Sequence, residues 1–214
     1  MRAGIMLSLL AIAWLCGCAD VAVKSAWQDG APRGQSFSRV LVVGVSPNYD
    51  LRCAFESDFA SELKSNATQA IPSCDGMKAE ERLTRENIER VIASVQADAV
   101  LVTSLVAVHA GESEGNSRDT RGDAGYKVTG FGTGYGFGEY GMPVTYAEFE
   151  TAPPITTVKS SFHVLTKLYE THGAKLLYTL DTKTKPFEVE STQDSIIRIT
   201  TPTADQLRRD GLIR

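Results

Sequence analysis

Two glycine-spaced motifs in the middle of the chain have the form of catalytic or cofactor-binding signatures. Gly111–Gly115 matches G-x-S-x-G, in which a sharp strand-to-helix turn exposes a nucleophilic serine. No helical pattern follows it, and the glutamates on both sides of Ser113 would oppose formation of an oxyanion. Gly136–Gly141 matches G-x-G-x-x-G, but Pro143 stands where the dinucleotide fingerprint requires a helix. We expect both matches to be glycine-rich loop.

The histidines give no support for metal or acid–base chemistry. His109, His163 and His172 share no metal-ligand spacing. His163, the most plausible general base, falls inside an expected strand, and His172 falls in an expected turn. The tripeptide Arg121–Asp123, which some adhesion receptors bind, lies where Gly and Asp are common in any loop. No nucleophile, base and orienting group can be placed together, so we expect no enzyme, no metal and no cofactor.

The N-terminus predicts covalent attachment of lipid. Arg2 precedes the apolar stretch Gly4–Leu15, as in a secretory signal peptide. Leu15–Cys18 then resembles a lipobox, with an aliphatic residue at −3 and a small residue at −1 before the acceptor cysteine. Cys16 does not fit as the acceptor, because Leu15 would occupy −1. We therefore predict a lipoprotein signal peptide over 1–17 and lipid on Cys18; a plain secretory leader is the alternative.

This assignment predicts where the protein resides. Lipid on Cys18 would attach the protein to a membrane, so a membrane is an expected partner. Asp directly after the lipid cysteine favours retention in the inner membrane of enterobacteria, and the residue here is Ala19. We expect the periplasmic face of the outer membrane, with the inner membrane as the less favoured location. Residues 18–36 are polar and contain Gly30, Pro32 and Gly34, which predicts a flexible tether.

Two cysteines, Cys53 and Cys74, lie outside the signal peptide and lipid site. In an oxidising compartment such a pair is expected to form a disulfide, which would stabilise the fold by roughly 3 kcal/mol in the chain-entropy model. Two free thiols and a metal site are the alternatives. The metal site is disfavoured because no His or further Cys lies close in the sequence.

Hydrophobic periodicity in the first half of the chain predicts alternating strands and helices. Strands are expected where apolar residues run continuously, and helices where they recur on one face. The expected elements are strands at 38–45, 69–73 and 98–108 and helices at 51–66 and 87–96. This β-α-β-α-β order implies parallel strands. It would also bring Cys53 and Cys74 to the same edge of the sheet.

The periodicity ends in an insert at 109–155, where glycine alternates with aromatic residues. An irregular stretch of this length is usually functional or disordered. Tyr and Phe offer a large contact area, which favours a partner surface. The alternatives are an irregular loop and a hairpin that becomes ordered on assembly. The candidate contact residues are Tyr126, Phe131, Tyr135, Phe137, Tyr140 and Tyr146, within the segment 126–149.

The rest of the chain predicts an antiparallel hairpin and a terminal helix. Strands are expected at 156–169 and 175–184, joined by a turn at His172 and Gly173. A helix is expected at 194–209, either kinked at Pro202 or split into two short helices. Together with the first half, this gives a single α/β (α+β) domain over 37–214: a mostly parallel sheet extended by an antiparallel hairpin, with a C-terminal helix.

Charge and hydropathy exclude two partner classes. The net charge of −4 offers no basic face for nucleic acid. The apolar runs at 40–45 and 97–108 are too short for a helix across a bilayer, which needs about 20 residues.

The segment from Val40 through the phenylalanine-striped helix to Thr103 resembles bacterial envelope lipoproteins of unknown function. Their α/β domain is related to the amino-terminal domain of the Tol-system propeller protein and to the curli secretion channel lipoprotein. The chain end at Leu207–Ile213 extends the resemblance. It implies a fold and no catalytic residues, and the insert lacks the apolar alternation of membrane hairpins. We expect a non-catalytic protein that binds or scaffolds envelope proteins. The alternative is an accessory subunit of an export or surface-assembly machine, and homo-oligomers would fit either role.

Overall fold

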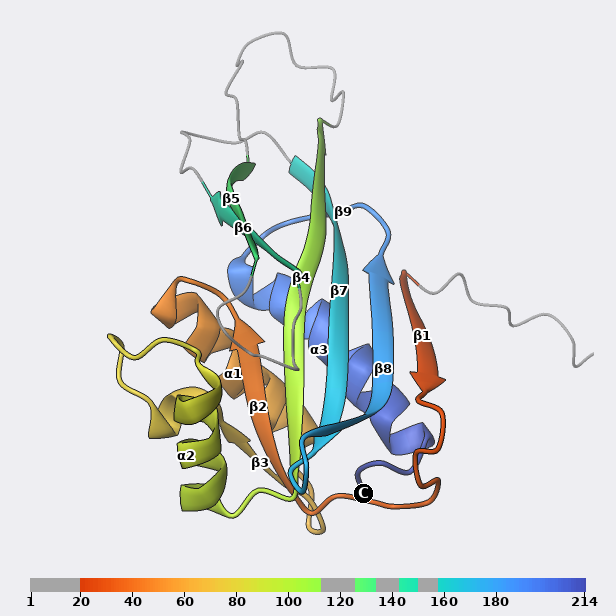
Figure 1. The fold of residues 1–214 in the computed structure, drawn as a ribbon. Helices are drawn as coiled ribbons and strands as arrows, with labels where there is room; N and C mark the ends of the chain where they lie inside the picture. The colour runs from red at the N-terminus through yellow and green to blue at the C-terminus, as the bar shows by residue number, and fades with distance from the viewer. Residues whose placement is uncertain (1–19, 113–125, 134–142, 150–157) are drawn as a thin grey trace, which may run out of the picture.

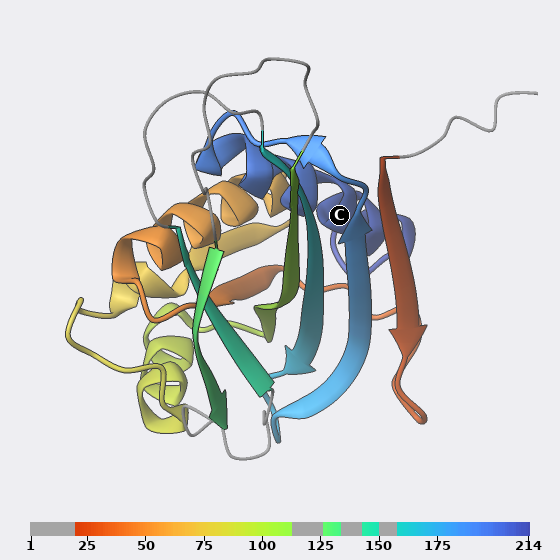
Figure 2. The ribbon, with the colours of Figure 1, turned by 90° about the horizontal axis from the view of Figure 1, so that it is seen from above.

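The computed structural model describes residues 20–112, 126–133, 143–149 and 158–214. Its centre is a seven-stranded mixed sheet with strand order β1-β8-β7-β4-β2-β3, and β9 pairs with β7. Helices α1 and α3 cover one face, and α2 covers part of the other (Figures 1 and 2). The expected mixed α/β sheet with a C-terminal helix is confirmed.

The parallel half of the sheet comes from the first half of the chain. Strand β2 (Arg39–Val45) pairs in parallel with β3 (Gln69–Pro72) and with β4 (Ala99–Glu112). Helix α1 (Tyr49–Leu63) connects β2 to β3, and α2 (Arg85–Val95) precedes β4. A short 3₁₀ helix, η1 (Ser73–Gly76), follows β3 and was not expected. Side chains on both faces of β2 are buried, which explains its continuous apolar run.

The antiparallel half is the expected hairpin, paired to the parallel half through β4. Strand β7 (Val158–Glu170) lies beside β4, and β8 (Lys175–Thr184) lies beside β7. The short strand β9 (Phe187–Glu188) pairs with the start of β7. The turn before β8 contains Gly173, whose φ of +83° favours glycine.

One expectation for the N-terminal segment is wrong. Within the expected flexible tether at 18–36, Val21–Trp27 form strand β1, which pairs antiparallel with β8 at the edge of the sheet. The Trp27 ring packs edge-on against Tyr178, with ring centroids 5.0 Å apart. Trp27 and Val23 are partly buried against the core, and this packing holds the segment in place as a strand. The composition of residues 18–36 did not indicate these contacts.

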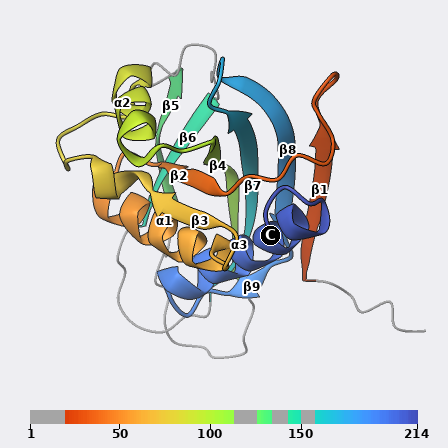
Figure 3. The same ribbon diagram turned by 90° about the horizontal axis from the view of Figure 1, so that it is seen from below.

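Helix α3 (Thr192–Arg209) passes through Pro202 as one helix, so the expectation of two short helices is wrong. Its N-cap, Ser191, accepts a hydrogen bond from the Asp194 N–H. Its inner face packs on the sheet beside α1 (Figure 3), and this packing offsets the hydrogen bond that proline cannot donate. Among the described residues, no helix is long and apolar enough to cross a membrane.

Part of the insert forms a separate hairpin. Strands β5 (Tyr126–Thr133) and β6 (Pro143–Phe149) pair antiparallel as a two-stranded sheet. Figures 2 and 3 both show this hairpin on the α2 side of the main sheet.

Candidate functional site

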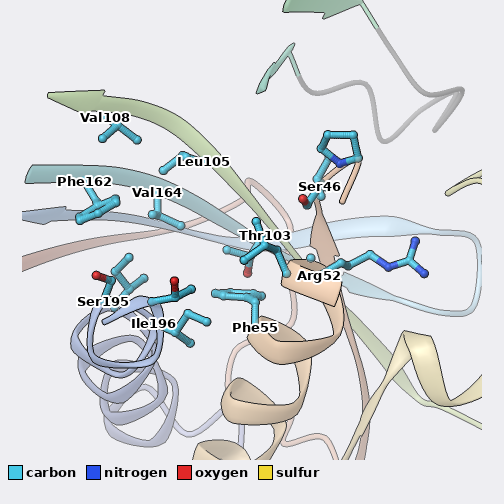
Figure 4. A pocket seen from close by; sticks show the side chains of 16 residues that line it. Ser46, Arg52, Phe55, Thr103, Leu105, Val108, Phe162, Val164, Ser195 and Ile196 are labelled. Carbon is cyan, nitrogen blue, oxygen red and sulfur yellow. The ribbon is translucent and has the colours of Figure 1, made fainter. Parts of the chain in front are cut away.

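An apolar pocket of about 190 Å³ lies between the sheet and the first turns of α1 and α3 (Figure 4). Most of its lining side chains are aliphatic or aromatic, and its polar groups are mainly hydroxyls. The lining residues are Gly44, Val45, Ser46, Pro47, Leu51, Arg52, Phe55, Thr103, Leu105, Val108, Phe162, Val164, Thr192, Ser195, Ile196 and Ile199.

The pocket is formed where the first turns of two helices face one end of the sheet. Strand β4 contributes Thr103 and Leu105 to its floor, and α3 contributes Ile196 from the facing side. The α1 wall is set by Phe55, which lies close to the backbone of Gly44. A Cβ atom at Gly44 would be 2.9 Å from Cδ1 of Phe55, so this position requires glycine for close packing.

A buried polar cluster lies behind the α1 wall. The Glu56 side chain is fully buried, and its carboxylate accepts hydrogen bonds from Gly44 N–H at 2.9 Å and Cys74 N–H at 2.8 Å. The Ser73 hydroxyl also donates to it, at 2.7 Å. Thus one side chain of α1 satisfies donors from both β2 and η1, and it fixes the helix against the sheet edge.

Arg52 is the cation of this cluster. Its Nε lies 3.8 Å from Oε1 of Glu56, and its guanidinium lies over the Tyr49 ring at 5.0 Å from the centroid. The side chain is only 4% exposed, and Nε and one terminal nitrogen have no hydrogen-bond partner among the described residues. Figure 4 shows the guanidinium directed away from the apolar side chains of the pocket. Arg52 therefore lines the edge of the pocket with the stem of its side chain, and its charge is directed away from the cavity.

Burial raises the pKa of the Glu56 carboxyl above its ordinary value. The three donors and the Arg52 charge act in the opposite direction and offset part of this effect. The cluster is thus a structural support for the pocket wall, with a titratable group at its centre.

The structure brings the two predicted disulfide cysteines together. Cys53 is in the first turns of α1 and Cys74 is in η1, and hydrogen bonds from Tyr49 to Cys74 O and from Cys74 N–H to Glu56 join these two segments. Both are free thiols in the structure. Their proximity agrees with the sequence argument, and the covalent bond stays a prediction.

The other candidate residues do not converge on the pocket. His163 lies on β7, and its Nε2 is 3.0 Å from Asp181 Oδ2. It follows the pocket residue Phe162, so its side chain points to the opposite face of the sheet. His172 lies in the turn before β8, as expected. The described part of the chain contains no cluster of His, Cys, Asp or Glu that could hold a metal ion.

Several sequence candidates fall outside the described residues. These are Cys18, Ser113, Arg121–Asp123, the motif at 136–141, and Tyr135, Phe137 and Tyr140 of the predicted contact segment. Tyr126 and Phe131 lie in β5, and Tyr146 lies in β6. The β5–β6 hairpin and the pocket are on opposite sides of the main sheet, so they do not form one surface.

Sequence reasoning missed the pocket and the Glu56 cluster. The phenylalanine stripe suggested that Leu51 and Phe55 lie on the buried face of α1, but Leu51 is 38% exposed. The face buried most deeply contains Arg52, Glu56 and Leu63. A signal was present: Arg52 and Glu56 are an i, i+4 pair of opposite charge, and Glu56 is in helical register with Leu63.

Comparison with known proteins gives structural likeness alone. No family model matches the chain, and no curated protein matches it. The PelC dodecamer from Paraburkholderia phytofirmans is 11% identical, with 91% of this chain and 99% of that chain covered and a TM-score of 0.46. Lipoprotein GNA1162 from Neisseria meningitidis is 14% identical, with 80% and 99% covered and a TM-score of 0.37. A PDZ domain protein from Parabacteroides distasonis is 9% identical, with 88% and 36% covered and a TM-score of 0.41.

Proposed function

We propose that the protein is a non-catalytic, lipid-anchored envelope protein whose apolar pocket receives a side chain of a partner envelope protein. The observation that carries this proposal is the pocket itself, which is lined mainly by apolar groups at the open end of the sheet. The lipobox at Cys18 supports the anchor and the compartment.

The size of the pocket favours a protein side chain over a larger metabolite. A cavity of about 150 Å³ lined by aliphatic and aromatic groups binds benzene, whereas drug-sized ligands occupy about 300–1,000 Å³. The volume here, about 190 Å³, is suited to a single aromatic ring or branched aliphatic chain. Apolar anchors that fill such pockets contribute most of the affinity at many protein interfaces.

The chemistry of the lining supports binding rather than catalysis. Its polar groups include the hydroxyls of Ser46, Thr103 and Ser195, and its edge has the stem of Arg52. The His163–Asp181 pair lies on the other face of the sheet, where it cannot act on a group bound in the pocket.

Site-specific photocrosslinking in intact cells tests the proposal. A photoreactive phenylalanine analogue replaces Leu51, which lines the pocket and is 38% exposed. Leu105→Trp in the same chain fills the pocket, and Val106→Trp is the matched control. Val106 is the next residue on β4, is 36% exposed and does not line the pocket.

The expected result is an adduct with an envelope protein that is lost with Leu105→Trp and retained with Val106→Trp. Mass mapping should place the crosslink at an apolar residue of that partner. Equal adduct yield in both tryptophan variants would contradict the assignment of the pocket. An adduct with phospholipid alone would show that an acyl chain, rather than a protein, is the occupant.

A further inference from the structure

We propose that Cys53 and Cys74 form a redox modification site, at which a disulfide oxidant converts two neighbouring thiols into a bond that fixes the α1 wall of the pocket. The first part concerns the cysteines alone. The second part, control of the pocket, rests on the proposed function.

The geometry places both thiols where oxidation is feasible. Cys53 and Cys74 are partly exposed, so an oxidant can reach them, and the carboxylate of Glu56, which follows Cys53 on α1, accepts a hydrogen bond from the Cys74 N–H at 2.8 Å. The hydroxyl of Tyr49, one helical turn before Cys53, lies 3.5 Å from the backbone oxygen of Cys74 and 3.2 Å from that of Met77, so the segment around Cys74 is held beside the first turns of α1. Thiols in this proximity need little backbone movement to bond.

The reaction transfers two electrons from the protein to the oxidant. The Cys53 thiol loses its proton, and its sulfur attacks one sulfur of a disulfide R–S–S–R, which releases one thiol RSH. The Cys74 sulfur then attacks Cys53 Sγ in this mixed disulfide and releases the second RSH with the Cys74 proton. One S–S bond forms in the protein as the S–S bond of the oxidant is reduced.

The order of attack follows from the surroundings of Cys74. Burial, the neighbouring Cys53 thiol and the Glu56 carboxylate all raise the pKa of the Cys74 thiol. The Glu56 carboxylate lies against the Cys74 N–H at 2.8 Å, so its negative charge opposes a thiolate at Cys74, and Cys53 reacts first with the external oxidant. Cys74 is the resolving residue.

The bond would act on the pocket through α1. Cys53 lies on the same helical turns as Leu51 and Phe55, which line the pocket. In the reduced protein, hydrogen bonds link α1 to η1 at this point: the Glu56 carboxylate accepts from Ser73 and the Cys74 N–H, and the Tyr49 hydroxyl contacts Cys74 O. A covalent link beside these hydrogen bonds makes the α1 wall more rigid, which favours binding to a preorganised pocket.

The experiment treats the purified full-length protein in detergent with oxidised or reduced glutathione. Peptide mapping should show a Cys53–Cys74 link that lacks the two thiol hydrogens. The melting temperature should rise by about 6–12 °C. Cys74→Ser should accumulate a glutathione adduct at Cys53, whereas Cys53→Ser should form less adduct at Cys74. Absence of the link under oxidised glutathione would overturn the modification site, whatever the pocket binds.

The control of the pocket is read separately, as the yield of the Leu51 photoadduct. Cells expressing the native cysteines should give at least about threefold more adduct than cells expressing Cys53→Ser or Cys74→Ser. If the bond forms but the yield is unchanged, the coupling to the pocket is wrong and the proposed function stands. If neither the native protein nor the serine variants give an adduct, the proposed function and the coupling are both wrong. The modification site is then judged by the peptide map alone.

Discussion

The buried carboxylate of Glu56 accepts a hydrogen bond of 2.9 Å from the backbone N–H of Gly44. This contact joins helix α1 to strand β2 at the point where the strand ends and the pocket begins. The same glycine has no side chain, which allows the ring of Phe55 to pack against it. One residue pair thus determines both the attachment of the helix and the position of the pocket wall.

Glu56→Ala should lower the free energy of unfolding by about 3–5 kcal/mol, because it leaves buried donors and the Arg52 charge without a partner. Urea denaturation followed by circular dichroism measures this loss. The matched control is Glu62→Ala on the same helix, where the side chain is partly exposed and a change within about 0.5 kcal/mol is expected. Equal losses in the two variants would show that the Glu56 cluster has no special role.

Glu56 should also give the protein a specific pH dependence. Its pKa is raised in the folded state, mainly by burial, so the folded state binds the proton more tightly than the unfolded state. The contribution of this group to stability is therefore fully present below the ordinary Glu pKa and declines as pH rises through the raised value.

Glu56→Gln provides the reference for this effect because it does not titrate. The difference in unfolding free energy, wild type minus Glu56→Gln, should be larger at pH 4 than at pH 7. Denaturant titrations at both pH values measure it. A difference that grows towards pH 7 would mean that the hydrogen bonds and the Arg52 charge lower the pKa of Glu56 by more than burial raises it.

Gly44→Ala should displace Phe55 and reduce the pocket. The new methyl group would lie 2.9 Å from Phe55 Cδ1 and 3.5 Å from Glu56 Cγ, so the helix or the ring must move. We expect a loss of about 1–3 kcal/mol in the free energy of unfolding, together with a loss of the Leu51 photoadduct. Phe55→Leu in the same chain should recover part of the stability. If Phe55→Leu recovers no stability, the contact between the new methyl group and Phe55 is not the cause of the loss.

The sequence predicted those parts of the fold in which hydrophobic periodicity is strong. The continuous apolar run at 40–43 gave β2, and the spacing of Ile88 and Val91 gave α2. The terminal helix was also predicted, although its continuity through Pro202 depends on tertiary packing that local rules do not include. The parallel pairing in the first half followed from the alternation of elements, and the antiparallel hairpin followed from the turn at His172 and Gly173.

The remaining features depend on contacts between distant segments. In strand β1 the apolar residues are interrupted by Lys24 and Ser25, so its order comes from pairing with β8 and from Trp27 on Tyr178. The pocket is lined by residues of α1, β4, β7 and α3, which are far apart in the sequence, so no local pattern encodes it. The burial of Glu56 was not predicted, because a glutamate in a helix is usually expected to face solvent.

Trp27→Ala tests whether β1 belongs to the folded domain. The ring packs on Tyr178 and against the main core, so its removal should lower the free energy of unfolding by about 2–3 kcal/mol. Lys24→Ala on the same strand is the control, because this side chain is exposed and should change stability by less than about 0.5 kcal/mol. If residues 20–27 were a free tether, both substitutions would be neutral in thermal or urea denaturation.

The docking of β1 has a consequence for the distance between the domain and the membrane. The strand begins at Val21, so only Ala19 and Asp20 lie between it and the predicted lipid site at Cys18, and the three Cα–Cα steps have a reach of about 10 Å. Val21 pairs with Thr184, whose hydroxyl accepts a hydrogen bond from the N–H of the pocket residue Phe162. If Cys18 carries lipid, the pocket end of the sheet therefore faces the membrane surface.

Nitroxide labels on cysteines placed at Ala22 and His172 would measure this orientation in vesicles, in a background with Cys53→Ser and Cys74→Ser. Both positions are exposed, and β1 and β8 place them towards opposite ends of the sheet. The Ala22 label should be relaxed more strongly by a headgroup-bound paramagnetic lipid than the His172 label. Insertion of a Gly/Ser linker of about 15 residues after Asp20 should remove this difference, because a flexible chain of that length spans about 20 Å. Equal relaxation at both sites without the linker would show that the domain moves freely relative to its anchor.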